Sequence, residues 1–196
     1  MTARRMAKDE RRRQLLETAF EIIRTEGTNA LTLVRLAERA GVSRPITYEH
    51  FKTREGLLLA LYREYDEQLG RKIRDARQNG AESLEAVASV LSTAYVDGVL
   101  AAGPECDEVN AALSGNRETR DFRQSSRDFY LEEFRKAFEP FAPLSRRADL
   151  AMLTGILGAA EGLAAAAATR RISRAKAISA STAIMVSAIG QALQQS

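Results

Sequence analysis

Apolar residues in the first part of the chain recur at intervals of three or four positions, the spacing that puts side chains on one face of an α-helix. Within residues 8–26 this face consists of Leu16, Ala19, Phe20 and Ile23. Gly27 then ends the pattern, because glycine readily adopts the left-handed conformation that caps a helix. The pattern predicts a first amphipathic helix over residues 8–26.

Two shorter helices are predicted directly after the first. Thr32 can cap a helix over residues 33–40, and Ser43 can cap another over residues 44–51. Pro45 falls in the first turn of the second of these helices, where its missing N–H has no intrahelical partner to lose. The proline therefore supports a helix start at this point.

The rest of the chain also has the pattern of helices. Thr53 can cap a long helix that carries many leucines and ends before Asn79 and Gly80. The further predicted segments are 84–103, a shorter one up to 115, a helix through 122–138 that Pro140 and Pro143 end, and alanine-rich helices over 146–170 and 173–194. Strand-forming residues are sparse, while Ala, Leu, Arg and Glu dominate and favour helix. We expect an all-α protein.

The composition narrows the class of protein. Of the 196 residues, 45% are hydrophobic, which is enough for a sizeable core and argues against a disordered chain. The single cysteine, Cys106, excludes an intramolecular disulfide and fits a reducing compartment, so the cytoplasm is the expected location. Its acidic neighbours do not favour a thiolate, and a redox-sensing role is not expected. The basic start is followed by no apolar run, so we do not expect a secretory signal.

Charge is unevenly distributed along the chain. Residues 1–54 hold 12 Lys and Arg against 7 Asp and Glu, whereas residues 55–196 hold 17 against 19. Clustered cations can replace the counterions along a row of phosphates, so a polyanion is expected to bind the amino-terminal part. A solvated charged surface is the alternative explanation.

One apolar segment, residues 150–169, is long enough to be considered as a membrane span. It consists mostly of alanine and glycine and has Glu161 near its middle. This composition packs against protein better than it partitions into lipid. We expect the segment to be a packed helix.

The stretch LAERAGVSRPITYEHF, residues 36–51, has the helix-turn-helix pattern, in which the second helix enters the major groove of DNA. Ala37 is small where the two helices must cross, and Gly41 supplies the turn. The residues expected to face the small core shared with the first helix are Leu36, Val42 and Phe51. The spacing alone is a weak signal, but its position after a basic amphipathic helix strengthens it.

Residues 31–62, LTLVRLAERAGVSRPITYEHFKTREGLLLALY, resemble the DNA-binding region of the TetR (tetracycline repressor) family of bacterial transcriptional regulators. The specific resemblance covers roughly residues 8–65; beyond it only length and helix order are similar. It implies a helix-turn-helix domain over residues 1–54 and a helical ligand-binding and dimerisation domain over residues 55–196. It also implies a homodimer that releases double-stranded operator DNA when a small-molecule inducer binds.

The resemblance also implies which residues contact DNA. Base edges are assigned to Arg44, Pro45 and Ile46, with Ser43 beside them, and phosphates or sugars to Thr32, Tyr48, His50, Lys52 and Arg54. A guanidinium can bond bidentately to guanine, whereas a proline or isoleucine offers only apolar contact. Thr47 departs from the family pattern, which usually has Leu or Ile facing the small core at this position.

Each of these assignments has a structural alternative. Pro45 and Ile46 could serve only to pack the start of their helix, and Tyr48 could pack over the first helix. His50 could in principle ligate a metal or act as a catalytic base, but no second ligand or carboxylate pair is suitably spaced; a hydrogen bond at the helix end or to DNA is expected. The basic run over residues 4–13 could follow the DNA backbone or remain a solvated tail.

An aromatic set could line the ligand cavity that the family resemblance implies. The candidate ligand-binding residues are Tyr65, Tyr95, Phe122, Phe129, Phe134 and Glu161. Ordinary core packing is the alternative for each aromatic residue. For Glu161 the alternative to a cationic or hydroxylated ligand is a salt bridge with Arg170 or Arg174 at an interface.

The last two predicted helices have features of an interface. Small residues at Gly155, Gly158, Gly162 and Ala166 would let another helix approach closely. The final helix is apolar on nearly every side over residues 183–189, so both faces need to be covered. A two-fold symmetric four-helix contact between two copies satisfies this need.

No enzyme motif is found: the sequence has no P-loop, no nucleophile elbow and no metal-ligand spacing, and no cofactor is implied. The favoured hypothesis is a ligand-responsive transcriptional regulator, acting as a repressor, and not an enzyme. A constitutive or architectural DNA-binding protein is the second hypothesis. The third is a helical enzyme or interaction module whose amino-terminal helices bind protein.

Overall fold

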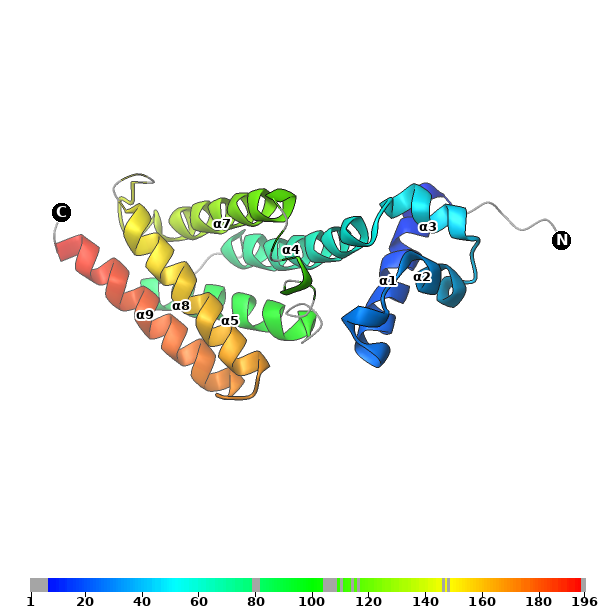
Figure 1. Ribbon diagram of the computed structural model, residues 1–196. Coiled ribbons are helices and arrows are strands. Elements are labelled where there is room, and N and C mark those ends of the chain that lie inside the picture. The colour runs from blue at the N-terminus through cyan, green and yellow to red at the C-terminus, as the bar shows by residue number, and fades with distance from the viewer. Residues whose placement is uncertain are drawn as a thin grey trace. The chain divides into compact units, whose positions relative to one another are not determined.

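The computed structural model describes residues 7–78, 82–103, 109, 111–113, 115, 117–145, 147 and 149–194. The helices in these ranges are α1 (Lys8–Glu26), α2 (Leu33–Ala40), α3 (Arg44–Phe51), α4 (Arg54–Gln78), α5 (Leu84–Ala102), α7 (Arg117–Phe138), α8 (Leu150–Ala168) and α9 (Arg174–Gln194), with a 3-10 turn, η1 (Thr28–Ala30) (Figure 1). No strand is found among the described residues. The predicted all-α fold is confirmed, whereas Cys106, Asn79 and Gly80 lie outside the described residues.

The chain forms two compact units. The amino-terminal unit comprises residues 1–65 and 105–119, and the carboxy-terminal unit comprises residues 66–104 and 120–196. The sequence-based division at residue 54 differs from this one in two respects. Helix α4 contributes its first part to the amino-terminal unit, and a segment from between α5 and α7 joins that unit as well.

The amino-terminal unit has its own hydrophobic core. Helices α1 and α2 and the start of α4 supply most of the buried side chains, and Phe51 closes the core from the end of α3. Val109 and Leu113 complete this core although they lie some fifty residues further along the chain. The exposed fraction of their side chains is 0% and 2%, respectively.

The ends of the first helices follow local chemistry. The hydroxyl of Thr32 accepts a hydrogen bond from the backbone N–H of Arg35 (3.0 Å), as predicted for an N-cap. Gly41 adopts the left-handed conformation, φ 64° and ψ 36°, which ends α2. Gly27 also has positive φ, but its ψ of 163° lies outside that conformation, so this detail of the prediction was wrong. The difference arises because the chain continues at once into η1, where Ala30 N donates to Gly27 O.

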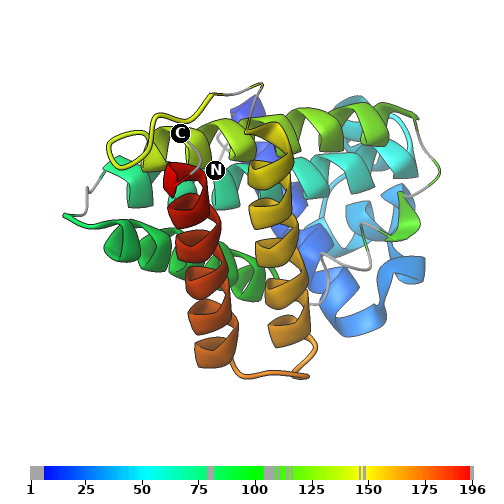
Figure 2. The ribbon, with the colours of Figure 1, turned by 90° about the vertical axis from the view of Figure 1, so that its left-hand side faces the viewer.

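The carboxy-terminal unit is built on α5, α8 and α9, which pack against one another. Helices α8 and α9 run side by side in opposite directions (Figures 1 and 2). The core between these helices and α7 is filled mainly by alanine, branched aliphatic residues and the rings of Tyr95, Tyr130 and Phe134. Ser92 and Ser181 share a buried hydrogen bond of 3.0 Å between their hydroxyls, which joins α5 to α9.

Two predicted helix starts differ from the structure. Helix α8 begins at Leu150 instead of residue 146, because the carboxylate of Asp149 accepts a hydrogen bond from Ser145 N (2.6 Å) and holds a turn before the helix. Helix α9 begins at Arg174, and the hydroxyl of Ser173 accepts from Lys176 N (3.2 Å). Ser173 is thus the N-cap rather than part of the helix.

Helices α5, α8 and α9 are each long and apolar enough to span a membrane by length and composition alone. In the carboxy-terminal unit each of them buries a stripe of side chains against the other two. The expectation that residues 150–169 form a packed helix agrees with this arrangement.

Candidate nucleic-acid interface and ligand site

The turn between α2 and α3 is fixed by backbone hydrogen bonds. Val42 N donates to Ala37 O (3.0 Å) and Gly41 N donates to Glu38 O (3.3 Å), while Gly41 supplies the left-handed geometry. Leu36 is fully buried beneath this turn and Val42 packs against the same core. The two helices therefore form the compact pair that the helix-turn-helix pattern predicts.

Thr47 anchors α3 to α2. Its side chain is completely buried, and its hydroxyl lies 3.0 Å from Leu33 O and 2.9 Å from Arg44 O. A buried hydroxyl without a partner would be costly, but here two carbonyl oxygens can accept its proton. The departure from the family pattern at this position is therefore compatible with a packed α3, because a polar contact takes the place of an apolar one.

One side of α3 is exposed and carries most of the predicted DNA contacts. Ser43, Arg44, Pro45 and Lys52 are exposed, and Tyr48 has 48% of its surface accessible. The ring of Tyr48 is thus accessible for the predicted contact with DNA. Ile46 is half-buried against the small core.

Ser43 precedes α3 but makes no side-chain capping bond, contrary to the prediction. Pro45 removes the N–H at the second helical position, and the next N–H, that of Ile46, donates to the backbone oxygen of Ser43 (3.0 Å). The N–H groups at the second and third helical positions, which an N-cap side chain normally bonds, are therefore not available to this hydroxyl. Exposed at the helix start, this hydroxyl keeps its predicted place in the DNA-binding set.

His50 is half-buried, with its ring centroid 6.0 Å from that of Phe51. Burial lowers the pKa of its imidazole below the ordinary value. The negative charge of Glu49 raises this pKa, whereas the positive charges of Arg12, Lys8 and Arg11 lower it further. The ring is therefore neutral near pH 7 and can donate one hydrogen bond. Within the described ranges no group of three His, Cys, Asp or Glu side chains could hold a metal.

Arg54, which was predicted to contact a phosphate, makes two hydrogen bonds within the amino-terminal unit. Its guanidinium donates to Leu31 O (2.9 Å, from Nε) and to Thr28 O (2.8 Å), so it ties the start of α4 to the connection between α1 and α2. A planar fork of donors is suited to two such acceptors at once. Arg54 acts as a structural clamp in this unit, which the sequence pattern did not indicate.

Arg12, within the basic run near the amino terminus, lies over the ring of Phe51, with 5.2 Å between its guanidinium carbon and the ring centroid. Such a cation–π contact holds the side chain against the protein. Residues 4–6 of the basic run lie outside the described residues.

Thr32 is exposed, and because its oxygen accepts from Arg35 N, its hydroxyl proton remains available to a phosphate.

The predicted ligand-binding aromatic residues are divided between the two compact units. Tyr95 and Phe134 are buried (5% and 0% exposed), and their ring centroids lie 6.4 Å apart in an edge-on contact. Tyr65 belongs to the amino-terminal unit, where its ring lies 4.6 Å from that of Phe20. Phe122 and Phe129 are half-buried on α7. The structure favours the core-packing alternative for Tyr95 and Phe134.

A polar network beside these rings was not predicted. Tyr130 donates its hydroxyl to the Asp66 carboxylate (2.9 Å), and Ser126 also bonds to that carboxylate. Burial, together with the negative charge of Asp66, raises the pKa of the Tyr130 hydroxyl. Asp66 lies on α4, whereas Ser126 and Tyr130 lie on α7, and only the packing of these two helices brings them together. No local sequence signal could therefore have identified the network.

Glu161 pairs with a residue other than those expected. Its carboxylate oxygens lie 2.7 and 2.6 Å from one guanidinium nitrogen of Arg127 on α7. Arg174, one of the expected partners, instead forms a bidentate pair with Asp97 at 2.6 and 2.7 Å. Glu161 thus forms a salt bridge, as the alternative predicted, but with Arg127 instead of Arg170 or Arg174. The sequence did not indicate that α7 lies beside this part of α8.

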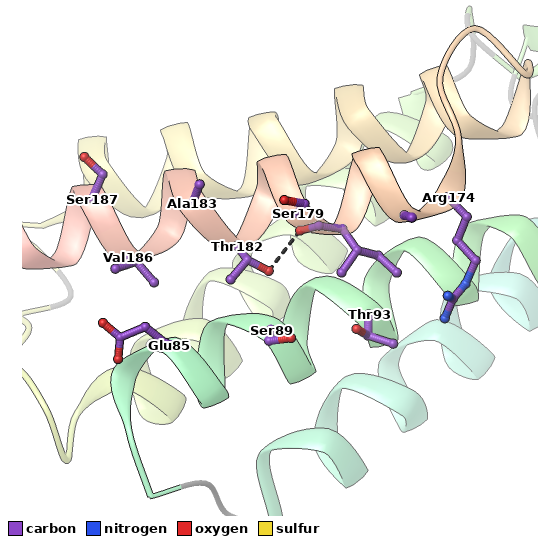
Figure 3. Close-up of a pocket in the computed structure, with 11 residues that line it drawn as sticks. Glu85, Ser89, Thr93, Arg174, Ser179, Thr182, Ala183, Val186 and Ser187 are labelled. Atoms are coloured by element: carbon purple, nitrogen blue, oxygen red, sulfur yellow. Dashed lines mark hydrogen bonds between the residues drawn. The ribbon is translucent and has the colours of Figure 1, made fainter.

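A groove of about 830 Å³ lies between α5 and α9 (Figure 3). It is lined mainly by small and hydroxyl side chains, with Glu85 and Arg174 at opposite ends. None of the predicted ligand-binding residues lines it.

Comparisons with known proteins agree with the geometry of the amino-terminal unit. The family model described as bacterial regulatory proteins, tetR family, matches residues 15–61. The HTH-type transcriptional activator FasR of Mycolicibacterium smegmatis is 39% identical over 72 residues, which are 37% of this chain and 33% of FasR. The HTH-type transcriptional regulator BetI of Escherichia coli is 38% identical over 89 residues, 45% of this chain and 44% of BetI. The chain thus matches less than half the length of these curated relatives.

The likeness in fold extends further than the likeness in sequence. A TetR-family transcriptional regulator from Streptomyces coelicolor has a TM-score of 0.71 at 17% identity, with 92% of this chain and 95% of that one covered. At this sequence identity the comparison shows a similarity of fold and not of function. The predicted combination of a helix-turn-helix and a helical carboxy-terminal domain is confirmed at that level.

Proposed function

We propose that the chain is a transcriptional regulator of the TetR family that binds operator DNA as a homodimer and represses transcription until a small molecule binds. The observation that carries the proposal is the exposed side of α3, a helix that Thr47 holds in place: Arg44 and Tyr48 are exposed on the helix, and Lys52 is exposed directly after it. We assign this activity to the bacterial cytoplasm, where operator DNA lies.

DNA recognition is proposed to divide between two kinds of contact. Arg44, at the first position of α3, is in the place from which a recognition helix reads base edges. Lys52, just after the helix, has positive φ (62°) and an exposed ammonium suited to a phosphate. Base contacts determine specificity, whereas phosphate contacts contribute affinity on any sequence.

Arg44→Ala is expected to weaken binding to the operator by about 1 to 3 kcal/mol while leaving affinity for unrelated DNA nearly unchanged. Lys52→Ala is the control: it should weaken binding to both duplexes alike and lower the dependence of affinity on salt. Fluorescence anisotropy with both duplexes at several salt concentrations measures these effects. Equal losses on operator and unrelated DNA for Arg44→Ala would show that Arg44 contacts phosphate instead of bases.

The homodimer is proposed to form through α8 and α9. Gly155, Gly158 and Gly162 lie along α8 with open space where a side chain would stand. Helix α9 buries Met185 and Ile189 on one side but leaves Ile184 42% exposed. Faces of small and apolar residues on adjacent helices suit a two-fold four-helix contact.

Gly158→Leu is expected to shift the protein towards monomer by overpacking this contact, at a cost of about 1 to 3 kcal/mol. Since a Cβ added at residue 158 has no neighbouring atom within 4 Å, the monomer should keep its fold. Sedimentation velocity and circular dichroism measure both properties. Ser125→Leu, at an exposed position on α7, is the matched control and should remain dimeric. A wild-type protein that sediments as a monomer at micromolar concentration would contradict the proposal.

Ligand control is proposed to act through α4. This helix runs without a break from Arg54 to Gln78, and the boundary between the two units falls within it, after Tyr65. A ligand that binds better to one arrangement of the carboxy-terminal unit would thereby change affinity for DNA. The relative named FasR is an activator, so the direction of control is tested by transcription in vitro with and without the protein.

Because allosteric coupling is reciprocal, operator DNA should weaken inducer binding by the same factor by which inducer weakens DNA binding, typically about 1 to 3 kcal/mol. Calorimetric titration of the inducer with and without operator measures this coupling. The buried packing of Tyr95 and Phe134 favours one competing function, a DNA-binding protein without a ligand. If the chain has this competing function, the heat of ligand binding would be the same with and without operator DNA, or absent in both titrations.

A further inference from the structure

The connection between α8 and α9 carries an unusual density of positive charge. Residues 169–176, TRRISRAK, contain four cations and no carboxylate, in a chain whose total net charge is only +3. Arg170, Arg171, Arg174 and Lys176 are all exposed. Like charges this close repel one another, so the arrangement favours an anion that neutralises them.

These four cations line a shallow, largely open pocket. The pocket has a volume of about 520 Å³, and Leu100, Ala167 and Ile172 provide its apolar part. A concave site with an apolar surface and a few charged groups is typical of small-molecule binding. A DNA duplex, by contrast, presents phosphates on a convex surface and needs no such hollow.

Arg174 is fixed at the edge of this pocket. Its Nε and one terminal nitrogen bond to the two carboxylate oxygens of Asp97 at 2.6 and 2.7 Å. The second terminal nitrogen still carries donors that this pair does not use. Arg170, Arg171 and Lys176 form no ion pair with any residue that the structure describes.

Arg170, at the end of α8, has a backbone conformation that is uncommon for a residue other than glycine. Helix α8 ends with Arg170 N donating to Ala167 O (3.0 Å) and Arg171 N donating to Ala166 O (2.9 Å), and Arg170 has φ 57°. Glycine is the favoured residue in this left-handed position of a helix end. An arginine in this position is less favourable for the backbone than a glycine.

We propose that the pocket at the α8–α9 connection binds a small organic molecule that bears a diphosphate or a comparable cluster of phosphate charges. Arg170, Arg171 and Lys176 neutralise the anion, and Arg174 orients it through its remaining donors. The apolar part formed by Leu100, Ala167 and Ile172 contacts the organic portion. This site is separate from the α3 surface, and the proposal does not depend on operator binding.

The test is isothermal titration of the full-length protein with inorganic pyrophosphate, with ADP and with a random duplex DNA. We expect one site per chain for each small anion, with ADP binding more tightly than pyrophosphate because of the apolar contact. Arg170→Gly should weaken both anions at least tenfold. The same variant should retain or raise the melting temperature, since glycine relieves the backbone conformation, and should leave the affinity for duplex DNA unchanged.

Arg123→Gln, which removes one exposed cation from α7, is the matched control and should leave anion binding unaltered. The proposal is overturned if neither anion binds at millimolar concentration, or if both variants weaken binding equally. It is also overturned if Arg170→Gly weakens duplex DNA binding while ADP binding persists, because the basic pocket would then serve the nucleic acid.

Discussion

Replacing Leu113 with alanine is expected to destabilise the amino-terminal unit by about 2 to 5 kcal/mol. Leu113 is 2% exposed and packs into the core formed by α1, α2 and the start of α4, so the truncation leaves a cavity there. Urea unfolding followed by circular dichroism measures the loss. Hydrogen exchange of the α1 to α3 amides assigns it to this unit.

Leu150→Ala is the matched control, because Leu150 is 47% exposed and loses the same atoms without leaving an internal cavity. Its free energy of unfolding should change by less than about 1 kcal/mol. If Leu113→Ala were as mild as Leu150→Ala, the segment around residue 113 would not be a structural part of the DNA-binding unit.

Arg54→Ala is expected to lower the stability of the same unit by about 3 kcal/mol. The change removes two hydrogen bonds from a charged donor, each worth about 1.5 to 3 kcal/mol, although water replaces part of them at this half-buried site. Arg54→Lys should recover part of the loss, since an ammonium can reach one carbonyl but cannot span Leu31 O and Thr28 O as the guanidinium does.

The two possible roles of Arg54 predict different measurements. A clamp lowers the unfolding free energy when it is removed and leaves the salt dependence of DNA binding unchanged in the folded protein. A phosphate contact would reduce that salt dependence by roughly one ion per contact and leave stability intact. The second result would contradict the assignment made from the hydrogen bonds.

The sequence predicted the elements whose causes are local. The N-cap at Thr32, the left-handed Gly41 and the bounds of α1, α2 and α3 follow from residue types within a few positions, and all agree with the structure. Helix amphipathicity likewise indicated which side of α1 is buried. These features do not depend on distant partners.

The features that the sequence missed depend on residues far apart in the chain. The insertion of Val109 and Leu113 into the amino-terminal core, the Arg54 clamp and the Arg127–Glu161 pair each join segments separated by more than twenty residues. Hydrophobic periodicity predicts which side chains are buried, but it does not predict which residues they pack against. The candidate ligand residues illustrate the same limit, because Tyr65 and Tyr95 belong to different compact units.

The central claim is that the exposed side of α3 reads a specific DNA sequence for a two-fold symmetric dimer. Selection of duplexes from a random library by the purified protein tests it directly, because such a library contains every candidate half-site. The account predicts enrichment of an inverted repeat, and loss of defined bases within each half-site when Arg44→Ala is used for selection. A library that remains random after repeated rounds with the wild-type protein would contradict the account.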